Sequence, residues 1–121
     1  MNLTDVPRLR MHNQRITVPS FEGPEEIVSW FGAMQVQDYA AVKWAVSLRS
    51  NNLTDNLLNR AFAEGKILRT HVLRPTWQFV TPADIGWMLQ LSAKRVHEQM
   101  TPWYRSSGLD TAVFKKKKQI R

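Results

Sequence analysis

The sequence has 121 residues, of which 43% are hydrophobic and 22% are charged, and these values are typical of one packed domain. It contains 0 cysteines, which excludes disulfides, thiolate catalysis and cysteine-bound metals. Its histidines, His12, His71 and His97, are too widely spaced for a histidine metal site, so we expect no metal and no cofactor. No apolar run is long enough to cross a membrane and the first residues do not resemble a signal peptide, so a cytoplasmic location is expected.

The formal net charge of +7 comes largely from one end of the chain. Lys115 to Lys118 and Arg121 supply 5 of the 17 basic residues, which leaves 12 basic residues against 10 acidic ones in residues 1–114. We therefore expect residues 1–114 to form the domain and residues 115–121 to form a basic tail. An argument for DNA binding must rest on how charges are arranged, because the domain itself is nearly balanced.

The first half of the chain predicts three helices. A short basic helix is expected over residues 5–15. Pro24 and two following glutamates mark the start of a second helix, since proline needs no N–H partner there and acids complement the helix dipole. Its buried stripe is expected to contain four residues at helical spacing: Ile27, Val28, Phe31 and Met34. A third helix is expected over residues 40–48, with Val42 and Val46 among its apolar positions.

The following segment predicts a fourth helix and then strands. Thr54 can cap this helix and Gly65 suits its end. The expected buried face consists of Leu57, Leu58, Ala61 and Phe62. The apolar period then changes from 3.6 to 2 over residues 67–73 and 76–80, which predicts a two-stranded hairpin.

A last helix is expected to begin at Thr81 and Pro82 and to reach about Gln99. Its expected apolar face consists of Ile85, Trp87, Met88, Leu89 and Leu91. Three helices followed by a hairpin are the order of a winged helix, in which the hairpin is the wing. The predicted fold class is therefore α+β, mainly α, a winged helix with a two-stranded wing, and such folds bind DNA or other proteins.

Three stretches of the chain together resemble one family. They read LRMHNQR at residues 9–15, MQVQDY at 34–39 and LRTHVLRPTW at 68–77. In this order they resemble the winged helix DNA-binding domain proteins of the AlkZ/YcaQ type, whose characterised members are bacterial DNA glycosylases that excise alkylated bases and unhook interstrand crosslinks. The resemblance covers about residues 5–114 and implies tandem winged helices around a DNA-binding concavity. Full-length members are several times longer, so the chain resembles their N-terminal portion.

The resemblance also implies catalytic residues. The family's motif is glutamine, an apolar residue, then glutamine or aspartate, and Gln35-Val36-Gln37 fits it. Residues two apart point about 200° apart on a helix but to the same side of an extended segment, so both amides can face one substrate only if the second helix ends before them. A carboxamide can hold a water or support a cationic sugar, and Asp38 is a neighbouring carboxylate that could act as a base if it reached that water.

Six further residues are candidates for contact with double-stranded DNA: Asn59, Arg60, Arg69, His71, Arg74 and Trp77. The basic side chains of the hairpin can reach phosphates, and its tryptophan can stack on a base. The asparagine and the arginine of the fourth helix belong to residue types that read bases in the major groove. Each of these residues also has a structural explanation. Trp77 could be a core aromatic and His71 a strand histidine with internal partners, while the other four could belong to a solvated polar face.

The function expected from the sequence is DNA binding by the N-terminal portion of a DNA-repair glycosylase-like protein. One domain is too small to enclose a duplex, so we expect this chain alone to be inactive. The alternatives are a non-catalytic DNA- or protein-binding module and a truncated product without function. The lysine run fits a DNA-binding arm, a solvated end or a frame shift, and we favour the frame shift. Apolar pairs such as Trp87 with Met88 and Trp103 with Tyr104 are expected to be exposed and could support a homodimer.

Overall fold

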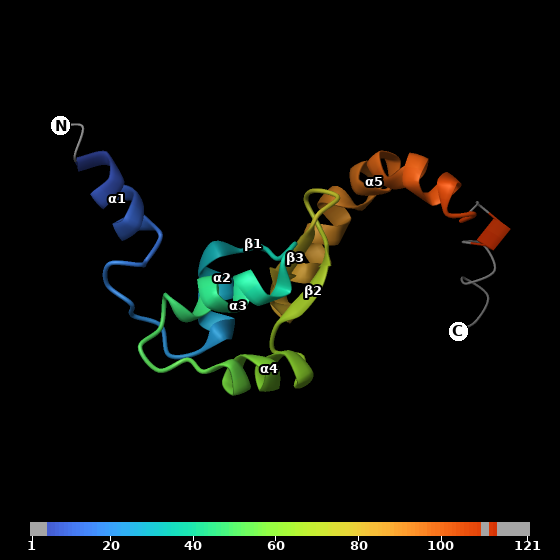
Figure 1. Ribbon diagram of the computed structural model, residues 1–121. Coiled ribbons are helices and arrows are strands. Elements are labelled where there is room, and N and C mark those ends of the chain that lie inside the picture. Colours follow the sequence, from blue (N-terminus) through green and yellow to red (C-terminus); the bar gives the residue numbers. More distant parts are fainter. Residues whose placement is uncertain (1–4, 110–111, 114–121) are drawn as a thin grey trace.

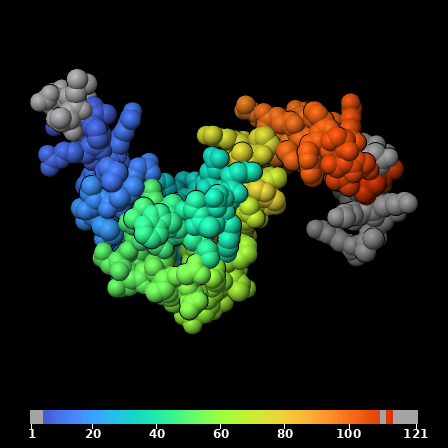
Figure 2. Space-filling model, in the orientation of Figure 1, coloured from blue at the N-terminus to red at the C-terminus, as the bar shows by residue number. Residues whose placement is uncertain are grey.

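The computed structural model describes residues 5–109 and 112–113, so the lysine run lies outside the described residues. Its helices and strands are α1 (Asp5–Asn13), α2 (Pro24–Phe31), β1 (Met34–Gln35), α3 (Tyr39–Ser47), α4 (Asp55–Ala63), β2 (Leu68–His71), β3 (Trp77–Val80) and α5 (Pro82–Ser106). The central elements form one body, from which α1 and the second half of α5 project on opposite sides (Figure 1, Figure 2). In the described ranges, no helix has the length and apolar character needed to cross a bilayer.

The sheet has three antiparallel strands in the order β1-β3-β2, rather than the two strands predicted. The additional strand, β1, arises because Gly32 adopts φ 69° and ends α2, which places Met34 in a strand and not on the helix. The prediction of Met34 on the helical stripe was therefore wrong. The fold class was predicted correctly as α+β and mainly helical, and the succession α2, β1, α3, α4, β2, β3 is compatible with a winged helix.

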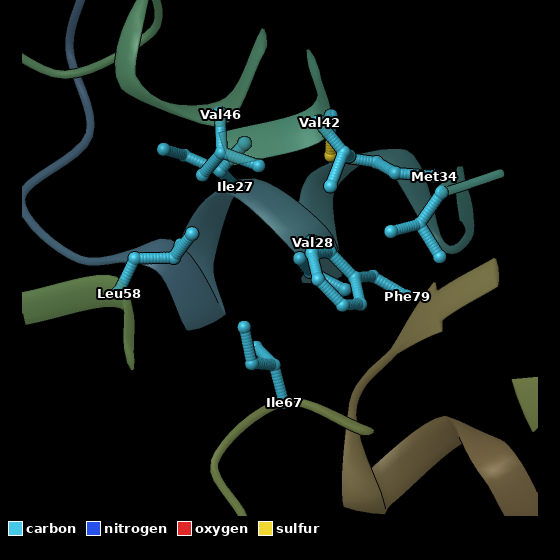
Figure 3. Packing of buried hydrophobic residues seen from close by; sticks show 9 residues of the cluster. Ile27, Val28, Met34, Val42, Val46, Leu58, Ile67 and Phe79 are labelled. Atoms are coloured by element: carbon cyan, nitrogen blue, oxygen red, sulfur yellow. The ribbon is translucent and has the colours of Figure 1, made fainter. Parts of the chain in front are cut away.

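The main core fills the space between α2, α3, α4 and one face of the sheet. Figure 3 shows side chains from all of these elements meeting there: Ile27, Val28, Met34, Val42, Val46, Leu58, Ile67 and Phe79. Leu58 and Ala61 are buried as predicted. Leu57 and Phe62 keep 39% and 38% of their surface exposed, so the prediction that they belong to the buried face was wrong. The buried stripe of α4 is narrower than a sequence pattern suggests, and these two residues lie at its margins.

Two arginines connect residues 9–15, the first of the three stretches that resemble the family, to the body. Arg49, at the end of α3, donates to Gln14 Oε1 at 3.1 Å and its guanidinium lies 4.9 Å from the Phe31 ring. Burial lowers the pKa of Arg49. Arg15 lies over the Trp30 ring at 4.3 Å. No residue of α1 is buried, and charged groups on aromatic faces connect the segment after α1 to the body.

A second, smaller core joins α5 to the other face of the sheet, and its buried members are Val72, Val80 and Met88. Since Met88 is only 1% exposed, the prediction that it belongs to an exposed apolar patch was wrong. Trp87 and Leu91 are instead 50% and 71% exposed, because the buried stripe of α5 runs through Met88, Ser92 and Val96 at a spacing of four. The helix also continues through Pro102 to Ser106, beyond the predicted end near Gln99.

Candidate nucleic-acid interface

The Gln35-Val36-Gln37 motif lies outside the helices, at the end of β1 and in the bend that follows it. α2 ends at Phe31, and the chain then runs through β1 towards α3. Val36 is completely buried in the main core, whereas Gln35 and Gln37 are exposed. This alternation is that of a strand, where every second side chain shares a face. The end of α2 before the motif, which both amides require if they are to face one substrate, is present, and a shared substrate remains a prediction.

Hydrogen bonds from the hairpin fix this segment. The Val36 N–H donates to the Trp77 carbonyl at 2.8 Å. The Trp77 N–H donates to Gln37 Oε1 at 3.3 Å, so the oxygen of this amide is turned towards β3. Arg69 Nη2 donates to the Val36 carbonyl at 3.3 Å. Both backbone polar groups of Val36, its N–H and its carbonyl, therefore have hydrogen-bond partners in the hairpin.

A third amide lies beside the motif. Gln35 is paired with Gln78 of β3, which is paired in turn with Thr70 of β2, and residues directly opposite each other in antiparallel strands share a face. Gln78 is only 6% exposed, and its Nε2 donates to Thr76 Oγ1 at 2.8 Å. Sequence inspection did not single out Gln78, although a glutamine inside the apolar strand Trp77–Val80 is the signal that could have found it.

Asp38 caps α3. Its Oδ1 accepts hydrogen bonds from the Ala40 and Ala41 N–H groups at 2.9 and 3.1 Å. Capping satisfies two donors that the first turn of a helix leaves without partners. The position of this carboxylate is explained by the helix and requires no role in chemistry.

Three predicted DNA-contact residues of the hairpin form one cluster. The Arg69 guanidinium lies 4.5 Å from the centre of the Trp77 ring, and the His71 ring lies 4.1 Å from it at a tilt of 52°. Burial lowers the pKa of His71, and the positive charge of Arg69 lowers it further. Trp77 is still 37% exposed, so it is neither a buried core aromatic nor a free stacking platform.

Arg74 lies outside this cluster, in the loop between β2 and β3. The preceding Leu73 adopts φ 65°, in the left-handed region, and its N–H donates to Ser92 Oγ of α5 at 2.9 Å. This bond ties the loop to α5. Arg74 is exposed, as a residue that meets a phosphate must be.

The two predicted residues of α4 differ in their surroundings. Asn59 donates to Asp55 Oδ2 at 2.8 Å and accepts from Lys43 Nζ at 3.4 Å. Lys43 in turn forms an ion pair with Asp55 at 2.5 Å, and its hydrogen bond holds the pKa of Asp55 below the ordinary value. Asn59 thus belongs to a network that joins α3 to α4, whereas Arg60 is exposed and has a loose ion pair with Glu64 at 3.9 Å.

A hollow of about 1010 Å³ opens elsewhere on the surface, between α2 and the start of α5, and its lining includes Phe21, Trp30 and Pro82. It does not include the glutamines of the motif or the predicted DNA-contact residues. Within residues 5–109 and 112–113, no group of three or more acidic or histidine side chains is placed to hold a metal ion.

Comparison with known families gives a match to part of the chain. The family model described as DNA glycosylase AlkZ-like matches residues 28–118, which is most of the chain and includes the glutamine motif and the hairpin. Searches of curated proteins and of solved structures found no match. On the family match, the chain belongs to the AlkZ-like DNA glycosylase family.

Proposed function

We propose that this chain binds double-stranded DNA through the face that carries Gln35 and Gln37. We further propose that, once a duplex covers this face, the two amides assist hydrolysis of the N-glycosidic bond of an alkylated base, contrary to the inactivity expected from the small size of the domain. The observation that carries the proposal is the alternation at the motif, in which both amides are exposed while Val36 between them is buried. Family membership supports a function in DNA repair.

The chemistry of the amides suits this reaction. When the C1′–N bond breaks, its electron pair goes to the cationic alkylated base, which leaves as a neutral molecule, and the sugar becomes cationic. Water then adds at C1′ and its surplus proton passes to solvent. A carboxamide carbonyl can stabilise the sugar cation, and the same group can orient the water by accepting and donating hydrogen bonds. No strong acid is required, since the leaving base already carries the positive charge.

The test is release of free N7-methylguanine from a methylated duplex. Gln35→Ala and Gln37→Ala are each expected to reduce the rate at least about a hundredfold, which is the usual effect of removing one preorganised polar group. Gln90→Ala is the matched control, because Gln90 is an exposed glutamine on α5, remote in sequence from the motif. Equal rates for the double variant and the wild type would refute the catalytic assignment.

A non-catalytic DNA-binding module is the second candidate, and the exposure of Arg60 and Arg74 favours it. If about five phosphates are neutralised, the logarithm of the binding constant should fall with the logarithm of salt concentration with a slope of about −4.5. Deleting residues 115–121 separates the contribution of the lysine run from that of the domain. A slope near zero in the shortened chain would exclude DNA binding by the domain.

A further inference from the structure

Arg69 reaches across the sheet to the glutamine motif. It lies on β2, which is separated from β1 by the middle strand β3. Its Cα is paired with that of Phe79, and Phe79 is paired on its other side with Met34. Strands are about 4.8 Å apart, so a group on β2 must extend over about two strand spacings to touch the β1 side. Arg69 does so, and its Nη2 meets the Val36 carbonyl at 3.3 Å.

Aromatic rings hold the guanidinium in this position. It lies 4.5 Å from the Trp77 ring and 5.9 Å from the Tyr39 ring. Trp77 comes from β3, and Tyr39 comes from the first turn of α3, two residues after the motif. A planar guanidinium stacks on such rings and still directs its N–H groups sideways, which an ammonium group cannot do.

The position of the Arg69 guanidinium has a cost. Its Nε is buried and has no hydrogen-bond partner in the part of the chain that the structure describes. A buried N–H without a partner is unfavourable, and native proteins keep such groups rarely and for a reason. The hydrogen bond to Val36 and the contacts with two rings are the features that offset this cost here.

We infer that Arg69 is a positioning residue for Gln35 and Gln37, acting through the backbone of Val36, and that it is not primarily a phosphate contact. Arg69 holds the carbonyl of Val36, while Trp77 holds its N–H and the oxygen of Gln37. Together these bonds keep the segment extended, which is the condition for both amides to share one face. The part of this inference that concerns catalysis rests on the proposed function, in which Gln35 and Gln37 assist base release.

The first test does not depend on activity. It measures hydrogen exchange at the Val36 amide in the full chain, with Arg69→Lys and Arg69→Gln as variants and the buried helical Val46 amide as the reference for global stability. Both variants are expected to increase Val36 exchange at least about tenfold relative to Val46, because local opening then requires less free energy. Arg95→Gln removes an exposed arginine from α5 and is expected to leave the ratio unchanged. An unchanged ratio in both Arg69 variants would overturn the inference.

The second test separates positioning from DNA contact. Arg69→Lys keeps the charge, so a phosphate contact would be rescued by lysine, and Arg69→Gln would then raise KM with kcat unchanged. Positioning predicts the opposite result for base release, with kcat reduced about tenfold or more in both variants and KM within about twofold of wild type. If the wild type releases no base, the proposed function fails, and the exchange ratio alone then decides the role of Arg69.

Discussion

Substitution of Val36 tests how far the arrangement of Gln35 and Gln37 depends on packing in the main core. Its side chain is 0% exposed and packs in the main cluster with Ile27 and Phe79. Val36→Ala removes two buried carbon groups, which costs about 1.6 kcal/mol in transfer free energy. Incomplete relaxation of the cavity adds up to about 1 kcal/mol. We therefore expect a loss of about 2 kcal/mol in the free energy of unfolding and a fall of about 10 °C in Tm.

Val28→Ala is the matched control, since Val28 is also 0% exposed and lies in the same cluster but on α2. Urea unfolding should give both variants similar losses of stability. Base release at a temperature where both are folded should separate them, with Val36→Ala losing kcat about tenfold more than Val28→Ala. Equal kcat values in the two variants would refute the view that the burial of Val36 aims the flanking amides.

Three further predictions concern residues around the motif. Asp38→Ala should cost about 1 kcal/mol in urea unfolding because a helix cap is lost, whereas Asp38→Asn should retain both the stability and the rate of base release; a large loss of rate in Asp38→Asn would identify it as a base instead. The folded-state pKa of His71 lies below its ordinary value of 6.5, so unfolding titrations should show stability decreasing as the pH falls from about 6.5 through the folded-state pKa, and His71→Gln should remove this dependence. Arg74→Gln should weaken DNA binding and reduce the magnitude of the salt slope by about one, and an unchanged slope would exclude a phosphate contact.

Local signals in the sequence were sufficient for most of the helices. Thr54 accepts from the Leu57 N–H and Gly65 adopts φ 71°, as their residue types predict for the two ends of α4. The strand β1 was not predictable in the same way. It has two residues, too few for an alternating pattern, and Met34 also fits the helical spacing of α2. Gly32 ends the helix before it, and pairing with β3, a long-range contact, then makes this segment a strand.

The same distinction explains what the sequence could and could not say of the candidate site. The residue types of Asn59 and Arg69 suit contact with DNA, and the chemistry of a side chain is visible in a sequence. Their partners in the fold are not, because Asn59 meets Lys43 and Arg69 meets Val36 only after distant segments pack together. The DNA contacts of these residues and of His71, Arg74, Trp77 and Arg60 remain predictions.

The exposure of Gln35 and Gln37 sets a final condition on the proposed chemistry. In open solvent, water competes for every hydrogen bond that an amide offers, so its net contribution is small. The same bond is worth more in a site from which water is excluded. The duplex itself must therefore cover the two amides if they are to stabilise a sugar cation. This reasoning predicts that wild type and Gln35→Ala hydrolyse the free nucleoside 7-methyl-2′-deoxyguanosine at the same slow rate and differ only on duplex DNA. A difference of similar size on the nucleoside, measured by chromatography of the released base, would show that the amides act without such a cover.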